Sequence, residues 1–279
     1  MKPAQFDYVC ADTIDEALAS LAEHGAKARI LAGGQSQVPM LNFRLIETDV
    51  LIDINRIEGL DYIRIEGGAL EVGAGTRQVD LKDCLDLAAT VPLLAAAMPH
   101  VGHFQTRNRG TVCGSIAHSD PSSELPLTLA TLEGEVVLRS KAGERTVKAA
   151  DFQVDLLTTA KRADEMITAV RFPLKAEGSG YAFNEMARRQ GDFAIVSLAA
   201  AVSATSVRLG VGGVAATPTV RDWPLADVGS DDAGLDDALN AFAWDLGGAD
   251  DIHATGQYRR ELVRRLGKRT IMEAKQCRD

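Results

Sequence analysis

Two glycine-bearing stretches of this chain have residue types that could bind an anion. The first reads AGGQS, from Ala32 to Ser36, and follows an apolar run. Glycine exposes backbone N–H groups without a Cβ in the way, and such groups are good ligands for phosphate oxygens. The stretch is neither a P-loop nor a G-x-G-x-x-G dinucleotide fingerprint. It predicts a phosphate or pyrophosphate site, with an ordinary strand-to-helix turn as the alternative.

The second stretch is RNRGTVCGSIAHSDPSSELP, from Arg107 to Pro126, which crowds short polar side chains around Gly110 and Gly114. Polar residues beside the apolar VCG and IA favour a backbone that enters the interior to hold a polar ligand. A surface loop with an Asp-Pro turn is the alternative. The two glycine-bearing segments together are more informative than either alone.

Composition and charge exclude several other classes of protein. A chain of 279 residues is long for one core, so two domains are expected. The net charge of −9 gives no general attraction to nucleic acid. The N-terminus is acidic where a signal peptide would be cationic and then apolar, and no window approaches the roughly 18 apolar residues of a membrane span. We expect a cytoplasmic protein with no membrane span and no nucleic-acid partner.

No local pattern indicates metal binding on this chain. His100 and His103 lie three apart without nearby carboxylates, and the GVGGVA segment at Gly210 does not open a helix, so a Rossmann interpretation is rejected. The cysteines form no C-x-x-C pair, so no sequence-local zinc or iron–sulfur site is expected. Any metal centre would belong to another chain. The four cysteines are Cys10, Cys84, Cys113 and Cys277.

The elements around the first stretch predict a small β-α-β-like lobe, residues 1–57. Thr13 and Glu16 have capping-box spacing at the start of a helix that Gly25 ends. Short buried strands are expected at 28–32 and 49–54, with AGGQS between them.

A second, mixed lobe is predicted over residues 58–173. It begins with a hairpin around Gly67 and Gly68 and ends with a second hairpin, GEVVLRSKAGERTVKA. Between the hairpins we expect a helical segment over 81–97 and then a loop-rich region that contains the second glycine-bearing stretch.

The polar segment LKAEGSG, residues 174–180, is expected to link this lobe to a C-terminal α+β domain, residues 174–279. An apolar hairpin, AIVSLAAAVSA and SVRLGVGGVA, precedes a polar acidic stretch and a long terminal helix. That helix carries a basic stripe, for which a solvated face is the first interpretation and a partner-subunit contact the second. The stripe comprises Arg259, Arg260, Arg264, Arg265, Lys268 and Arg269.

The two stretches together resemble the flavin-binding medium subunit of the molybdenum hydroxylases, the family of carbon monoxide dehydrogenase, xanthine dehydrogenase and the aromatic N-heterocycle hydroxylases. The similarity continues in order through VPMLNFRL, DEMITAVRFP, ARRQGDFAIV, LGVGGVAATP and YRRELVRRL, across nearly the whole chain. It implies an α+β fold. A two-lobed FAD-binding domain of the vanillyl-alcohol-oxidase-like type, residues 1–173, would precede a smaller α+β domain with an antiparallel sheet.

The resemblance implies an FAD-containing oxidoreductase subunit that transfers electrons. Substrate oxidation would occur at the molybdenum cofactor of a large subunit, and [2Fe-2S] clusters of a small subunit would pass electrons through FAD to an external acceptor. A dimer of heterotrimers is expected. Neither the organic substrate nor the acceptor is indicated by the sequence. The alternatives are a free-standing FAD-dependent oxidoreductase and a non-catalytic nucleotide-binding module.

The resemblance also implies which residues hold FAD, and it implies no catalytic acid or base. The first stretch would hold the pyrophosphate and the second would form another cradle. His118 would contact the flavin and Glu124 the sugar region, while Phe193 could cover one flavin face or be a core aromatic residue. The implied cofactor-binding residues are Ile30, Leu31, Ala32, Gly33, Gly34, Gln35, Ser36, Thr111, Val112, Cys113, Gly114, Ser115, His118, Glu124, Met166, Ile167 and Phe193.

The chain departs from the family pattern at two positions. Cys113 stands where the second motif usually has a glycine, so this residue would have to adopt backbone angles that glycine adopts freely. Asn184 stands where xanthine-dehydrogenase-like members have a lysine near the flavin. Without that positive charge, NAD is a doubtful electron acceptor.

Overall fold

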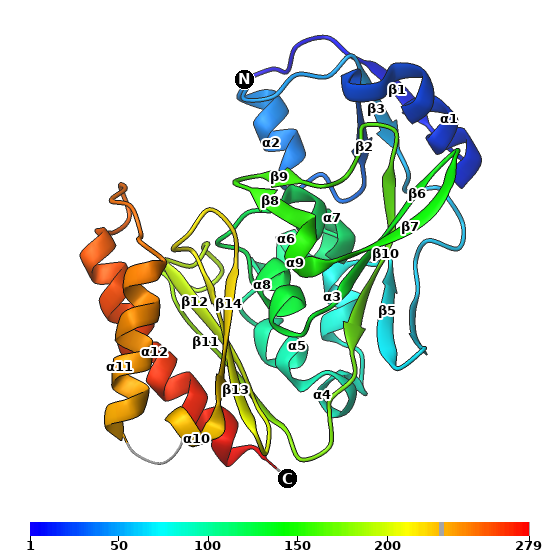
Figure 1. The fold of residues 1–279 in the computed structure, drawn as a ribbon. Helices are drawn as coiled ribbons and strands as arrows, with labels where there is room; N and C mark the ends of the chain where they lie inside the picture. The colour runs from blue at the N-terminus through cyan, green and yellow to red at the C-terminus, as the bar shows by residue number, and fades with distance from the viewer. Residues whose placement is uncertain (229–231, 279) are drawn as a thin grey trace.

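The computed structural model describes residues 1–228 and 232–278, and these fold around three main sheets of three, five and four strands (Figure 1). The three-stranded and five-stranded sheets belong to the first part of the chain, and the four-stranded sheet belongs to the C-terminal part. The chain is thus a mixed helix and strand protein with two domains. Residues 229–231 of the predicted acidic stretch lie outside the described residues.

The first lobe is the expected β-α-β arrangement, with one strand more than the sequence predicted. Its parallel sheet has the order β1-β3-β2. The Thr13 side chain accepts a hydrogen bond from the Glu16 N–H at 3.2 Å, which fixes the start of the helix that covers the sheet. The additional strand is β1. It is half exposed and has no buried apolar run, so its sequence did not indicate a strand. The elements are β1 (Asp7–Cys10), α1 (Ile14–His24), η1 (Gly25–Lys27), β2 (Ala28–Leu31), α2 (Gln37–Asn42) and β3 (Val50–Asp53).

The second lobe is built on an antiparallel sheet of order β4-β5-β10-β6-β7. Both predicted hairpins are confirmed. Gly67 and Gly68 have φ values of 59° and 80°, which suits the tight turn between the first two strands. The strands are β4 (Ile63–Glu66), β5 (Ala69–Gly73), β6 (Glu135–Ser140), β7 (Gly143–Lys148) and β10 (Met166–Pro173), and a separate small hairpin is formed by β8 (Gln153–Asp155) and β9 (Thr158–Thr159).

The helices of the second lobe differ from the prediction in two respects. The helical segment expected over 81–97 occurs as three short helices rather than one. The break at Val91 has a local cause, because Pro92 keeps this residue out of the helical conformation, at φ −136° and ψ 71°. The expected loop-rich region is largely helical. The elements are α3 (Gln78–Lys82), α4 (Leu87–Thr90), α5 (Pro92–Ala97), α6 (Phe104–Arg109), α7 (Val112–His118), α8 (Glu124–Thr131) and α9 (Ala149–Phe152).

The C-terminal domain is an antiparallel sheet of order β11-β12-β13-β14, covered on one face by α11 and α12 (Figure 1). The apolar hairpin and the terminal helix are confirmed. Gly180 lets α12 approach, since a Cβ there would overlap the carbonyl oxygen of Ala274. The elements are β11 (Gly180–Met186), β12 (Val196–Val202), β13 (Ser206–Gly212), β14 (Thr219–Pro224), α10 (Leu225–Val228), α11 (Asp232–Asp245) and α12 (Gly256–Gln276).

Helices α5 and α8 cover the other face of the C-terminal sheet and join the two domains. Leu93, Ala97 and Leu127 of the first domain form an apolar cluster with Phe183 and Ala199 of the sheet. The two domains therefore share a continuous packed junction.

The basic stripe of α12 is mostly a solvated face, as first interpreted. Arg265 pairs with Glu261, and Arg269 pairs with Glu273 at 2.8 Å. Arg259 is the exception, because it is buried and donates to the carbonyl oxygens of Ile195 and Gly213, both at 2.6 Å. No helix among the described residues has the length and apolarity needed to cross a membrane.

Candidate functional site

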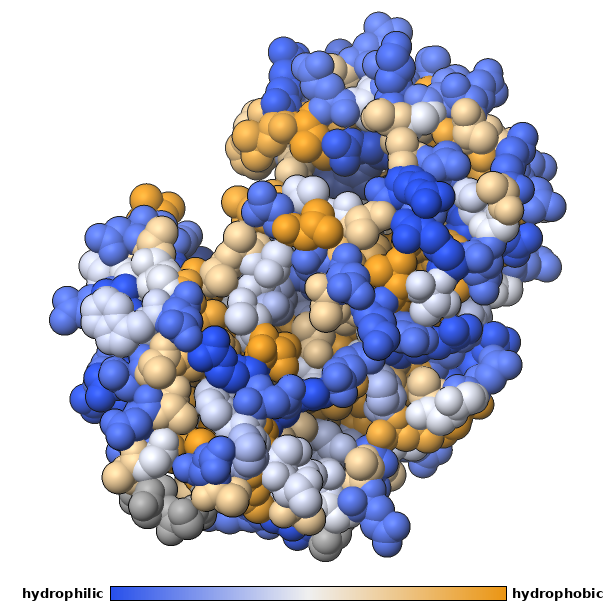
Figure 2. Space-filling model, in the orientation of Figure 1, coloured by the Kyte–Doolittle hydropathy of each residue, from blue (hydrophilic) through white to orange (hydrophobic). Residues whose placement is uncertain are grey.

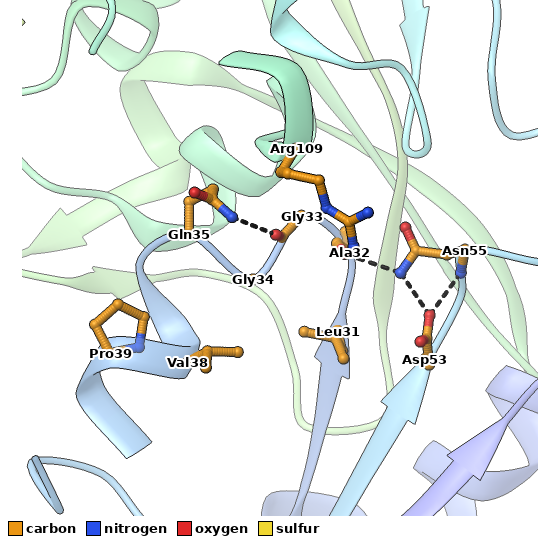
Figure 3. A pocket seen from close by; sticks show the side chains of 10 residues that line it. All are labelled: Leu31, Ala32, Gly33, Gly34, Gln35, Val38, Pro39, Asp53, Asn55 and Arg109. Carbon is orange, nitrogen blue, oxygen red and sulfur yellow. Dashed lines mark hydrogen bonds between the residues drawn. The ribbon is translucent and has the colours of Figure 1, made fainter. Parts of the chain in front are cut away.

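A pocket of about 390 Å³ opens at the carboxyl ends of β2 and β3, around the first glycine-bearing stretch (Figure 3). Open α/β sheets bind ligands at this edge, because the loops that follow adjacent parallel strands meet there. Its walls come from the turn after β2, from α2, from the residues after β3 and from the end of α6. The lining residues are Leu31, Ala32, Gly33, Gly34, Gln35, Val38, Pro39, Asp53, Asn55 and Arg109.

The turn from Gly33 to Ser36 presents free backbone donors. None of its four main-chain N–H groups donates a hydrogen bond to another group of the described residues. Side chains instead bind one carbonyl group in the turn and the one just before it: Gln35 Nε2 donates to Gly33 O at 3.0 Å, and Asn55 Nδ2 donates to Ala32 O at 2.9 Å. These carbonyl groups are thus hydrogen-bonded within the protein, while the N–H groups of the turn remain available. This arrangement suits an anionic ligand such as a pyrophosphate.

The two predicted stretches meet at one point. A Cβ placed on Gly33 would be 2.3 Å from the carbonyl oxygen of Arg109 and 2.6 Å from the Cα of Gly110. Only glycine fits this approach without displacing a backbone. Gly34 has φ 71°, a left-handed conformation that also favours glycine.

The second stretch, expected to lie in a loop-rich region, forms the start of a helix, and its role as a second cradle stays a prediction. Thr111 caps α7, and its Oγ1 accepts from the Gly114 N–H at 3.1 Å. Gly114 makes room for this cap, since a Cβ there would be 2.7 Å from Thr111 Oγ1. The N–H groups of Val112 and Ser115 also have partners, in Thr76 O and Thr111 O. This segment therefore offers fewer free donors than the first.

The departure at Cys113 has a simple structural explanation. The residue lies in the first turn of α7 and has no left-handed backbone conformation, so a glycine is not required. Its side chain is buried in the core of the first domain, and Sγ donates to Val72 O at 3.6 Å.

Two arginines give the pocket a positive edge. Arg77 donates to Asn55 Oδ1 at 2.6 Å and to the Arg109 carbonyl oxygen at 2.5 Å. Burial, and then the neighbouring Arg109 charge, lower the pKa of Arg77. The exposed Arg109 side chain reaches over the turn (Figure 3), and no ion pair within the described residues neutralises it.

Asp53, Asn55 and Arg77 also contribute to this site, although their residue types in the sequence did not indicate it. Asp53 accepts from Tyr8 OH at 2.6 Å and from the Asn55 N–H at 2.8 Å. Burial opposes its ionisation, but these hydrogen bonds hold the pKa of the carboxyl below its usual range. The signal for Asp53 and Asn55 was their position at the end of β3, because residues at the ends of adjacent parallel strands share one edge. Arg77 precedes α3 in the second lobe, and no local signal in the sequence indicated it.

The remaining predicted residues lie outside this pocket. Ile30, Met166 and Ile167 belong to strands, and the last two side chains are buried in the core of the first domain. His118 ends α7, and burial lowers its pKa. Phe193 precedes β12 with 57% of its surface exposed, so the interpretation as a core aromatic residue is wrong.

Glu124 begins α8 and is only 5% exposed. Burial raises the pKa of its carboxyl to about 7. Nearby, His100 Nδ1 lies 3.2 Å from Oε1 of Glu185, a carboxylate that the local sequence around His100 could not reveal. The hydrogen bond to Glu185 raises the pKa of His100, against the effect of burial.

Asn184 does not face the first domain. Its Nδ2 donates to Glu273 Oε2 at 2.6 Å and to Thr270 Oγ1 at 3.2 Å, both on α12. Its neighbour Glu185 points to the opposite face of the sheet, because successive residues of a strand alternate. The side chain that this part of β11 offers to the first domain is therefore an acid.

Comparison with known proteins identifies the family to which this chain belongs. Residues 4–175 match the FAD binding domain in molybdopterin dehydrogenase, and residues 181–274 match the CO dehydrogenase flavoprotein C-terminal domain. The chain belongs to the flavoprotein subunits of the molybdenum hydroxylases. This confirms the family and the oxidoreductase class that the sequence resemblance implied.

Members of the molybdenum hydroxylase family match this flavoprotein over most of its length. The 6-hydroxypseudooxynicotine dehydrogenase complex subunit alpha of Paenarthrobacter nicotinovorans is 36% identical, covering 98% of this chain and 96% of the relative. The carbon monoxide dehydrogenase medium chain of Hydrogenophaga pseudoflava is 35% identical, and the match covers 80% of this chain and 79% of the relative.

A solved structure from the same organism is also similar. It is a carbon monoxide dehydrogenase that lacks the Mo-pyranopterin moiety of the molybdenum cofactor. It superposes with a TM-score of 0.91 at 31% identity, and the match covers 100% of both chains.

Within the described part of this flavoprotein, no group of three or more histidine, cysteine, aspartate or glutamate side chains is arranged to hold a metal ion.

Proposed function

We propose that this chain holds FAD and passes electrons from the iron–sulfur clusters of a small partner subunit to an external acceptor. The observation that carries the proposal is the turn from Gly33 to Ser36, which has unpartnered N–H groups and in which Gly33 lies against the Arg109 backbone. FAD supplies the redox chemistry when it is bound, and the chain positions it and tunes its surroundings.

The pyrophosphate of FAD would be held by the N–H groups of this turn and by the Arg109 guanidinium. Arg77 fixes the wall behind it through the Arg109 carbonyl oxygen. The start of α7, residues 111–115, contacts the cofactor from the other side in this proposal. Asp53 and Asn55 form the end of the pocket nearest β3 and would lie toward the adenosine half.

The flavin half would extend along α7 toward the junction of the two domains. A helix rises about 1.5 Å per residue, so the seven residues of α7 span roughly 10 Å, from the glycine turn to His118. His118 and Glu124 are reached at the far end, and Phe193, exposed before β12, is available to cover a flavin face. Met166 and Ile167 would support the site through the core.

The partner subunits require a docking surface, and exposed apolar side chains offer one. Figure 2 shows hydrophobic residues gathered at α2 and at the β8–β9 hairpin, beside a hollow below the first lobe. Such residues are unusual on a free surface when they cluster. We propose that this face contacts the small iron–sulfur subunit, within a heterotrimer whose large subunit carries the molybdenum cofactor. The residues are Val38, Phe43, Leu45, Val154, Leu156 and Leu157.

The decisive experiment is an FAD titration of the purified chain, followed by an absorption spectrum. Tight binding of one FAD per chain, and flavin reduction only in the presence of the iron–sulfur subunit and substrate-reduced large subunit, is the expected result. A correctly folded chain without tight flavin would contradict the proposal. Oxidation of an organic substrate by the isolated chain would instead favour a free-standing oxidoreductase.

Several finer points stay predictions. They are the vanillyl-alcohol-oxidase-like character of the FAD-binding domain, the domain and lobe boundaries at 57/58 and 173/174, the dimer of heterotrimers, and the cytoplasmic location.

A further inference from the structure

Two buried oxygen atoms without partners face the first domain from the C-terminal sheet. Glu185 of β11 and Ser197 of β12 are paired directly across the strands, so their side chains lie on the same face. Glu185 Oε2 and Ser197 Oγ are both buried, and neither has a hydrogen-bond partner among the described residues. Since buried polar atoms are nearly always satisfied in native proteins, a ligand or an ordered water is expected here.

Glu185 is held in a fixed orientation. Its side chain is only 5% exposed, and its other oxygen, Oε1, lies 3.2 Å from Nδ1 of His100. The His100 ring also packs against Phe183, with 5.2 Å between ring centroids. Because Oε1 is held next to His100, Oε2 of Glu185 has a fixed direction.

The segment before α8 covers this polar face. A Cβ on Gly212 would be 2.6 Å from Ser197 Oγ and 3.0 Å from the carbonyl oxygen of Pro121, so the absence of a side chain at Gly212 lets Ser197 and the segment approach. Glu124 follows in the same segment, close enough for its charge and that of Glu185 to influence each other. Asp120 and His100 are the other charged groups that act on Glu124.

These groups select a ligand by their chemistry. Two carboxyl groups and one hydroxyl group accept hydrogen bonds, so the ligand must carry several donors but no strong negative charge. His100 already balances one carboxylate, which removes the need for a cation. A chain of hydroxyl groups satisfies both conditions.

We propose that Glu185, with Ser197 and Glu124, binds the ribityl hydroxyl groups of FAD. This inference rests on the proposed function, because it needs the pyrophosphate at the glycine turn. The ribityl chain follows the pyrophosphate in FAD, and α7 leads from the turn to this segment over about 10 Å. The C-terminal domain therefore contributes an acid to the cofactor site, at the position next to Asn184.

The test compares FAD and ADP binding to wild-type protein and to variants of the full chain, by flavin fluorescence and by competition. ADP has the pyrophosphate but no ribityl chain. Glu185→Met is expected to weaken FAD binding about tenfold to a hundredfold, as for loss of a hydrogen bond to a charged group, and to leave ADP binding unchanged. Ser197→Ala is expected to weaken FAD binding by roughly threefold to tenfold.

His100→Leu separates ligand binding from domain packing. It removes the hydrogen-bond donor to Glu185 but keeps the Glu185 carboxyl, so it should weaken FAD binding less than Glu185→Met does. Equal losses for these two variants would assign Glu185 to domain packing and overturn the inference. Unchanged FAD binding by Glu185→Met, or by Ser197→Ala and Glu185→Gln together if the first variant does not fold, would leave the oxygens to ordered water and overturn it too. If wild-type protein fails to bind FAD, the proposed function itself fails.

Discussion

Gly33 lies against the backbone of Arg109, at a distance that leaves no room for a Cβ atom. This contact brings residues from two lobes together, because Gly33 follows the parallel sheet and Arg109 ends a helix of the second lobe. The pocket is therefore lined by residues of both lobes.

Gly33→Ala should therefore weaken FAD binding at least tenfold. The new methyl group would push the turn from the Arg109 carbonyl oxygen, at 2.3 Å, and misalign the free N–H groups. The measurement is an FAD titration monitored by flavin fluorescence. Gly67→Ala is the matched control: it lies in a hairpin turn with open space around it, so it should cost about 1 kcal/mol of stability but leave FAD affinity unchanged. Equal effects of both variants on affinity would contradict the assignment.

Arg109→Gln should weaken FAD binding about fivefold to tenfold and make it less sensitive to salt. The guanidinium is a positive charge beside the proposed pyrophosphate, and exposed charge interactions are screened by ions. Dissociation constants measured at two salt concentrations check this. Lys141→Gln, an exposed charge at the far hairpin of β6 and β7, should change neither quantity. An Arg109 variant with unchanged salt dependence would argue that the backbone alone holds the anion.

Thr111→Ala should reduce the free energy of unfolding by about 1 kcal/mol, through loss of the cap on α7, and should also weaken FAD binding several-fold. Thr13→Ala removes an equivalent cap from α1, which is remote from the pocket. Its cost in stability should be similar, with FAD affinity unaffected. Urea unfolding and FAD titration of both variants test whether α7, but not α1, contributes to FAD binding.

Glu124 should make the flavin-free protein less stable as the pH rises. Burial raises the pKa of this carboxyl from 4.5 to about 7, so the folded state holds a proton that the unfolded state releases in that window. The free energy of unfolding should fall on the order of 3 kcal/mol between about pH 4.5 and pH 7, and then level off. Glu124→Gln removes this dependence, so its advantage over wild type should be small at pH 4.5 and largest near pH 8. A constant difference across these pH values, measured by urea unfolding, would be the contrary outcome.

Local features of the fold were predictable from the sequence. The cap at Thr13 and the turn at Gly67 and Gly68 involve residues close together in the chain, and both occur as expected. Helix α7 was missed because Gly114 and the surrounding polar residues favour a loop. In the structure the same glycine makes room for the Thr111 cap, so a residue typical of irregular backbone permits a helix start.

The site was predictable only in part, because its contacts join distant segments. The glycine turn could be found from residue types alone. The approach of Arg109, and the pairing of His100 with Glu185, depend on how the lobes and domains pack. Asn184 was expected near the flavin, but strand alternation turns it toward α12 and leaves Glu185 facing the first domain. A shift of one residue along a strand moves each side chain to the other face of the sheet. The sequence alone does not determine which residue of β11 faces the first domain.

The burial of α8 on both sides limits how this protein can be divided. Leu125 and Leu129 of the helix pack into the core of the first domain, while Leu127 packs against Phe183 and Ala199 of the C-terminal sheet. A fragment that ends before β11 would expose that second surface to water. The two segments matched by separate family models should therefore behave as one folding and assembly unit, and exchange of C-terminal domains between related flavoproteins should succeed only when the facing side of α8 is exchanged with them.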